Sequence, residues 1–216
     1  MTHLKRNSVP RVWPIERKGT TFIALPLHGM KNSIPVLVIL RDILGLASKR
    51  KEAEQIIHMK KVKINGEIIH EDKFPVTLFD VVDLDGKNYR LVYNQRKYGV
   101  QEIAEKEAHS KIAKVTGKSM VKGKKLQLNL NDGRNYLSTH KAKINDSAIV
   151  NFKEKKISEI LELKKGAKII FITGKHIGET GKIDHVEGEK IIIELANEKI
   201  NGTSKSIMVV KWLKKK

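Results

Sequence analysis

Short runs of Ile, Leu and Val, separated by turn residues, extend through most of this 216-residue sequence. The longest apolar run, Ile34 to Leu40, is far below the about 20 residues that a membrane-spanning helix needs. Hydrophobic residues make up 40% of the chain, which is enough for a buried core. A chain of this length can hold one to three domains, and the regular apolar pattern excludes a wholly disordered chain. With no apolar run long enough for a membrane span, we expect a soluble intracellular protein.

The second constraint is charge, because 43 Lys and Arg residues stand against 24 Asp and Glu, a formal net charge of +19. Like charges repel one another in a compact fold, so a surplus of this size indicates a polyanionic partner. Nucleic acid is favoured, since cations that neutralise its phosphates release condensed counterions. An anionic membrane would require a basic amphipathic helix, which no segment provides well. A solvated basic surface without a specific partner is the remaining alternative.

The first 34 residues predict an extended basic arm. Prolines at positions 10, 14 and 26 oppose regular helix, and Glu16 is the only acid in the segment. Trp13 and Phe22 are expected either to attach the arm to the rest of the protein or to stack on bases. The arm's candidate nucleic-acid-binding residues are His3, Lys5, Arg6 and Arg11.

Residues 35–86 predict two helices followed by a small sheet. Apolar residues recur with helical spacing from residue 35 to 46, and Ser48 is a good N-cap for a second helix that runs to about residue 60. Short strands are expected at 62–64, 67–70 and 80–84, with an Asn-Gly turn at 65–66.

The first turn of the second predicted helix carries three cations, residues 49–51, where the helix dipole is already positive. A bound phosphate would reverse this unfavourable term, because it accepts hydrogen bonds from both the free N–H groups and the cations. The alternative is that Glu52 and Glu54 balance the turn. The candidate phosphate-binding residues of this region are Arg41, Ser48, Lys49, Arg50, Lys51, Lys60, Lys61 and Lys63.

Residues 37–84 resemble the RNA-binding module shared by ribosomal protein S4 and several RNA-modifying enzymes. The segments that carry the resemblance are residues 40–42, 47–53, 56–57, 62–66 and 80–82. The resemblance implies that the loop and the start of the second helix contact the RNA backbone.

Residues 87–163 predict a central, mostly β domain. Strands are expected at 89–93, 126–130 and 148–152, a short helix over Ile103 to Val115, and a hairpin at Asp132-Gly133. Lysines are dense from residue 111 to 125, which indicates either a solvated face or phosphate contacts. The candidate RNA ligands are Lys118, Lys122, Lys124, Lys125 and Arg134.

Residues 164–216 predict strands at 168–172, 182–186, 191–195 and 205–213, and a basic tail at 214–216. Glycines 174, 178 and 181 allow backbone freedom and close approach in the loop before the second strand. This strand–loop–strand resembles the KOW motif of ribosomal proteins and elongation factors, which implies a small SH3-like barrel; an ordinary hairpin is the alternative. The candidate RNA ligands are Lys175, His176 and Lys182.

These segments occur in the order shown by one family, the archaeal and eukaryotic small-subunit ribosomal protein S4e. His3 to Arg6, Pro10, Trp13, the Ser33–Pro35 entry and residues 126–135 add to the resemblance. It implies an α+β fold of an arm and three modules, residues 1–34, 35–86, 87–163 and 164–216. The implied function is a structural, cytoplasmic role in translation, with small-subunit ribosomal RNA and neighbouring ribosomal proteins as partners. Neither a membrane nor a homo-oligomer is expected.

Motifs for catalysis are not found in the sequence. The chain has no Cys, and its eight His residues show no metal-ligand spacing, so neither a metal nor a cofactor is expected. The glycine-lysine pairs lack the remaining residues of a P-loop. Pseudouridine synthases can carry the same helical module, but the residues around Asp132 differ from their catalytic stretch. An RNA-associated transcription or translation factor, or an accessory of an RNA-modifying enzyme, is the alternative function.

Overall fold

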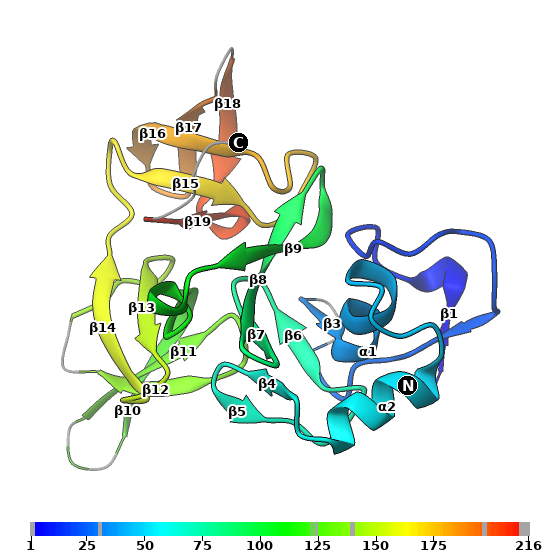
Figure 1. Ribbon diagram of the computed structural model, residues 1–216. Helices are drawn as coiled ribbons and strands as arrows, with labels where there is room; N and C mark the ends of the chain where they lie inside the picture. Colours follow the sequence, from blue (N-terminus) through cyan, green and yellow to red (C-terminus); the bar gives the residue numbers. More distant parts are fainter. Residues whose placement is uncertain are drawn as a thin grey trace. The chain divides into compact units, whose positions relative to one another are not determined.

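The computed structural model describes residues 3–29, 32–121, 123, 125–138, 141–195 and 198–211 (Figure 1). Strands dominate these residues and the helices among them are short. The chain divides into two compact units, Met1–His109 and Ser110–Lys216, which are described separately below. No helix in the described part of the chain combines the length and the apolar character needed to span a membrane.

The N-terminal segment is packed onto the first unit. Strand β1 (Leu4–Lys5) pairs antiparallel with β2 (Phe22–Ile23), and the 3₁₀ helix η1 (Arg6–Ser8) follows β1. Leu4 and Trp13 are each only 2% exposed, and the amide of Tyr98 donates a 2.6 Å hydrogen bond to the carbonyl of Val12. The expected arm is therefore folded rather than extended, because burying these two side chains offsets the charge repulsion along it. Trp13 takes the attachment role.

The two predicted helices are confirmed, with shorter bounds. The first consists of α1 (Val36–Val38) and the π-helical turn η2 (Ile39–Ile43), and Gly45 follows it with a left-handed φ of 65°, as a C-terminal stop requires. The second, α2 (Arg50–His58), buries Ala53 and Ile57. Before α1, strand β3 (Ser33–Pro35) pairs with β6 (Pro75–Thr77).

A five-stranded antiparallel sheet completes the first unit, in the order β5-β4-β7-β8-β9. Its strands are β4 (Val62–Ile64), β5 (Glu67–Ile68), β7 (Val81–Leu84), β8 (Lys87–Asn94) and β9 (Lys97–Ile103). Strand β8 pairs with β7 in a register that includes Val82 opposite Tyr89. The module boundary expected at residue 87 therefore falls at a turn inside one sheet.

The first sheet of the second unit has the order β12-β11-β10-β13-β14. Its strands are β10 (Ser110–Val121), β11 (Lys125–Leu130), β12 (Asn135–Ser138), β13 (Ser147–Asn151) and β14 (Lys156–Leu161). Val115, Leu128 and Val150 lie in its apolar core. The edge strands β12 and β14 also contact each other, so the sheet curls until its two edges meet (Figure 1).

The helix predicted over Ile103 to Val115 is wrong. Only the 3₁₀ turn η3 (Glu105–Glu107) forms, and β10 begins at Ser110. The apolar spacing that indicated a helix belongs instead to a strand with β11 on one side and β13 on the other. Residues 111–115 are all buried, so both faces of this strand are covered. The sequence therefore lacks the alternation of apolar and polar residues that indicates a half-buried strand.

The second sheet of this unit has the order β18-β17-β16-β15-β19. Its strands are β15 (Lys168–Phe171), β16 (Thr180–Glu187), β17 (Lys190–Glu194), β18 (Lys199–Thr203) and β19 (Ile207–Val209). Strand β19 returns to pair with β15, as expected for the closing strand, whereas β18 was not expected because its sequence has one large apolar residue. The described pairings form an open order with β18 and β19 at its edges.

The glycines of the 173–181 loop have the two roles expected of them. Gly174 and Gly178 have φ values of 93° and 84°, which favour glycine. A Cβ on Gly181 would lie 2.8 Å from the carbonyl oxygen of Glu194, so this glycine permits the close approach of two strands.

Candidate nucleic-acid interface

The start of α2 is capped by the chain's own carboxylate. Glu52 Oε2 accepts hydrogen bonds from the backbone N–H groups of Ser48, at 2.7 Å, and Lys49, at 3.3 Å. The N-cap residue is Lys49, with extended backbone angles, so the prediction of Ser48 as N-cap is wrong. These hydrogen bonds, led by the one from Ser48, hold the pKa of Glu52 below its ordinary value. These contacts agree with the alternative in which Glu52 and Glu54 balance the turn, because Glu52 accepts the backbone N–H groups and Glu54 pairs with Arg50. A phosphate added here would contact the lysine side chains.

Only two of the three cations at this helix start are left for a ligand. Arg50 Nε lies 2.7 Å from Asp72 Oδ2 and 3.0 Å from Glu54 Oε1, and the Asp72 side chain is only 9% exposed. Arg50 therefore ties α2 to the loop that precedes β6. Lys49 and Lys51 are exposed, and the described residues offer them no ion-pair partner. We identify these two lysines as the available charge.

Three further lysines lie at the end of α2 and on β4. Lys60 is exposed and has a left-handed φ of 58°. Lys61 and Lys63 lie 3.4 Å and 3.8 Å from Asp85 and Asp83 respectively, and each has about half of its side chain in solvent. Exposed pairs of this kind contribute about 0 to 1 kcal/mol, so a phosphate can replace either carboxylate.

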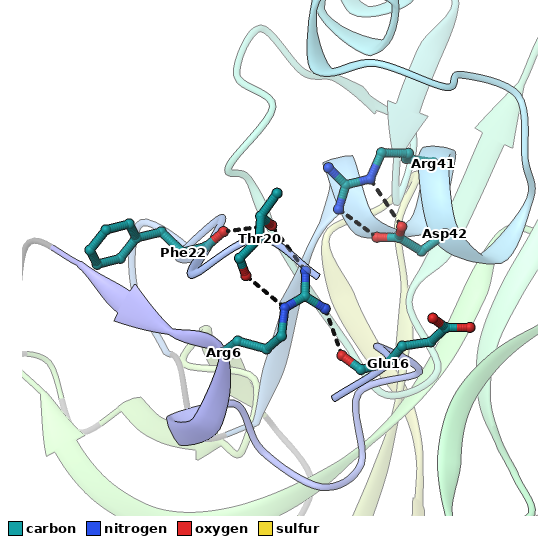
Figure 2. A network of polar contacts seen from close by, with 6 residues as sticks. All are labelled: Arg6, Glu16, Thr20, Phe22, Arg41 and Asp42. Atoms are coloured by element: carbon teal, nitrogen blue, oxygen red, sulfur yellow. Dashed lines mark hydrogen bonds and ion pairs between the residues drawn. The ribbon is translucent and has the colours of Figure 1, made fainter. Parts of the chain in front are cut away.

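Arg6 and Arg41 are already engaged within the first unit (Figure 2). The Arg6 guanidinium donates to the carbonyls of Thr20, at 2.7 Å, and Glu16, at 2.6 Å, and also to the Thr20 hydroxyl. Arg41 forms a two-pronged pair with Asp42 at 3.0 and 2.8 Å. The guanidinium groups of both arginines therefore stabilise nearby segments of the first unit.

The remaining candidates of the N-terminal segment are exposed. The rings of His3 and Phe22 lie 5.6 Å apart, and Phe22 is 56% exposed, so part of this aromatic pair faces solvent. Lys5 and Arg11 are also exposed.

In the second unit, Lys118 on β10 and Lys125 on β11 are exposed on paired strands. Arg134 lies in the turn before β12, where its backbone N–H donates to Asp132 Oδ1 at 2.9 Å. Lys122 and Lys124 lie outside the described residues.

On the second sheet of this unit, Lys175 and Lys182 are exposed. His176 is turned toward its own loop, because its Nδ1 lies 2.8 Å from Glu179 Oε2 and its ring lies 5.7 Å from that of Phe171. The structure therefore brings these candidates to one loop and the strand that follows it.

The sequence reasoning missed a group of cations around β12 and the β13–β14 turn. Lys141, Lys155 and Lys156 line the same pocket as Lys125 and Arg134. The run 153–156 contains three lysines, which is a signal in itself, but only the curling of the sheet brings it beside β12.

No three His, Asp or Glu side chains gather as a possible metal site in the part of the chain that the structure describes.

Comparisons with known proteins identify the family of this chain. The family described as "Ribosomal family S4e" matches residues 85–157, and the S4 domain matches residues 36–82. The small ribosomal subunit protein eS4 of Methanosphaera stadtmanae is 37% identical over 191 residues, covering 86% of this chain and 79% of that protein. The chain belongs to the ribosomal S4e family.

Other members of the S4e family are similar to this chain over most of its length. The eS4 proteins of Archaeoglobus fulgidus and Nanoarchaeum equitans are 37% and 36% identical, covering 84% and 85% of this chain and 78% and 82% of their own lengths. The crystal structure of the 30S ribosomal protein S4e from Thermoplasma acidophilum superposes with a TM-score of 0.72 at 30% identity, covering 83% of this chain and 95% of that one. The family expected from the sequence is therefore confirmed, including its S4 domain.

Proposed function

We propose that this chain is a structural constituent of the small ribosomal subunit that binds ribosomal RNA. Membership of the S4e family carries the proposal, since the relatives are named as small-subunit ribosomal proteins. The net charge of +19 supports it, because a protein that contacts RNA phosphates at many points needs such a surplus. The role in translation and the cytoplasmic location follow from this placement.

The contacts are distributed over separate patches. In the S4 domain the contacts come from Lys49, Lys51 and Lys60. In the first sheet of the second unit they come from Lys118 and Lys125, and in the last sheet from the 173–182 segment. Each exposed cation contributes a phosphate contact that carries no base sequence information. Patches joined on one chain raise one another's effective concentration, so the whole chain binds more tightly than any single patch.

The finer assignments of modules belong to the same proposal. The strand–loop–strand from β15 to β16, with its left-handed glycines at 174 and 178, supports a KOW motif, and its return strand β19 supports an SH3-like barrel. We further propose that the segments 1–34, 35–86, 87–163 and 164–216, of which the second and third share one sheet, each contact the ribosome next to neighbouring ribosomal proteins. The chain would act as a single copy, without a membrane, a cofactor or catalytic turnover.

Sedimentation of tagged protein from a lysate tests the proposed function. A structural constituent should co-sediment with small subunits and stay with them after a moderate-salt wash. A transcription or translation factor would exchange freely and appear in the ribosome-free fractions, and an accessory of a modifying enzyme would change the chemical marks on RNA when removed. Recovery of the folded protein only away from ribosomes would refute the proposal.

A further inference from the structure

A pocket of about 1180 Å³ lies where the two edges of the first sheet of the second unit meet. Its walls come from β12, from the start of β14 and from the start of β11. Pockets for small ligands commonly measure about 300 to 1000 Å³, so this one has room for a larger or extended ligand. Because β12 and β14 are edge strands, no further strand of the described chain lies between them.

The rim of this pocket is strongly basic. Five cationic side chains line it, and Glu154 is the only acid among the lining residues. Lys125, Lys141 and Lys156 are exposed, and the described residues provide no ion pair for any of them. The occupant that complements this rim is an anion with several charges. The five cations are Lys125, Arg134, Lys141, Lys155 and Lys156.

The floor of the pocket is apolar. Leu126 and Tyr136 are half-buried against the core of the sheet, and Ile157 is part of that core. Leu137 also lines the pocket and is 53% exposed. The occupant therefore also has apolar surface to place against these residues.

Unpaired RNA has both properties at once. In duplex RNA the bases are stacked inside and the surface presents phosphates and 2′-hydroxyls, whereas unstacked bases offer flat apolar faces beside charged phosphates. Proteins that bind single strands combine a positively charged channel with aromatic side chains on which the bases stack. We propose that the pocket between β12 and β14 binds a short unpaired segment of ribosomal RNA, with phosphates on its lysines and bases against its apolar lining.

This inference rests on the proposed function, and the experiment is designed so that the two can fail separately. The full-length chain is titrated with small-subunit ribosomal RNA, with a short fluorescent oligouridylate and with an RNA duplex, each over a range of salt concentrations. A rim variant combines Lys141→Glu with Lys156→Glu, and a floor variant carries Leu137→Ser. The matched control combines Lys143→Glu with Lys153→Glu, which are exposed lysines of the same unit that do not line the pocket.

The rim and floor variants should differ in their salt dependence. For oligouridylate, the slope of log affinity against log salt should flatten by about 0.7 for each phosphate that the rim variant no longer neutralises. The floor variant should bind about fivefold more weakly, or about 1 kcal/mol, with an unchanged slope. The control should keep most of the wild-type affinity, and the duplex should be insensitive to Leu137→Ser.

Three outcomes would overturn the pocket proposal. One is equal behaviour of the rim and control variants in a chain that still binds ribosomal RNA, which leaves the proposed function intact. The second is a wild-type chain that binds ribosomal RNA but does not bind oligouridylate even at low salt. The third is tighter binding of a poly-glutamate peptide than of oligouridylate, which would identify an acidic protein segment as the occupant. Failure of the wild type to bind ribosomal RNA at all would refute the proposed function as well.

Discussion

The ammonium nitrogen of Lys114 lies 2.6 Å from the carbonyl oxygen of Ser204, although 90 residues separate the two in sequence. The same nitrogen also donates to the carbonyls of Lys205, at 2.9 Å, and Ile207, at 2.8 Å. Lys114 belongs to β10 of one sheet, and the three carbonyls lie in the 3₁₀ helix η4 (Ser204–Ser206) and at the start of β19 of the other sheet. A single buried cation therefore joins the two sheets of the second unit.

Replacing this lysine should destabilise the second unit. Lys114→Met keeps the length of the side chain but leaves three carbonyls without their donor, and we expect a loss of about 2 kcal/mol in the free energy of unfolding. Burial lowers the pKa of Lys114 to about 8, from 10.5, so the unfolded chain holds this proton more tightly. Wild-type stability should therefore rise relative to the variant as pH increases from 8 to 10.5. Urea unfolding at several pH values measures both effects, and equal midpoints would contradict the prediction.

The lysine-rich stretch around Lys114 shows where sequence reasoning fails. Lys111 and Lys114 were indistinguishable in sequence from the exposed lysines that follow them, yet Lys111 is buried in an ion pair with Asp132. Only the pairing of β10 with strands on both sides, and the return of a distant segment over it, buries these two charges. Local pattern cannot predict such partners because they lie far away along the chain.

Elsewhere the sequence was sufficient because the structure is local. The two helices, the strands at 62–64 and 126–130 and the glycine-bearing loop at 173–181 follow from spacing, capping and turn residues of nearby positions. At the start of α2 the sequence indicates the cluster of charged residues but not the contacts that each residue makes. Glu52 accepts the backbone N–H groups and Arg50 pairs with Asp72, which leaves Lys49 and Lys51 without an ion pair among the described residues.

The different contacts of these α2 residues predict which charge reversals weaken RNA binding without changing stability. Lys49→Glu combined with Lys51→Glu should leave the unfolding midpoint unchanged, weaken binding to small-subunit ribosomal RNA and flatten its salt slope by about 1 for each phosphate that is no longer neutralised. Lys87→Glu combined with Lys106→Glu is the matched control, because both lysines are exposed and the charge change is the same. Salt titrations that fail to separate the two double variants would rule out this patch.

Replacing Arg50 should act mainly on stability. Arg50→Met removes the partner of the nearly buried Asp72 carboxylate, and since Arg50 itself is about half exposed, we expect a loss of about 1 kcal/mol. In a double-mutant cycle with Asp72→Asn, the interaction free energy between the two residues should account for most of this loss. Additive effects of the two substitutions would show that the pair contributes nothing.

The close approach at Gly181 should tolerate no side chain. In Gly181→Ala the new Cβ would lie 2.8 Å from both Glu194 O and Ile193 Cγ2, and we expect a loss of about 1 to 3 kcal/mol as the strands shift. Gly117→Ala is the control, because its Cβ would meet nothing closer than 3.5 Å. Equal thermal stability of the two variants would mean that the strands β16 and β17 are not held at this distance.

The cap on α2 should make part of the stability of the first unit depend on pH. The hydrogen bonds from Ser48 and Lys49 hold the pKa of Glu52 below its ordinary 4.5, so their contribution is complete above pH 4.5 and is lost as pH falls through the lower, folded-state value. Glu52→Gln should therefore melt at a lower temperature than wild type at neutral pH, and the difference should shrink below pH 4.5. Glu71→Gln, at an exposed acid outside the cap, should show no such convergence. A difference between wild type and Glu52→Gln that stays constant into strong acid would mean that the carboxylate charge is not what caps the helix.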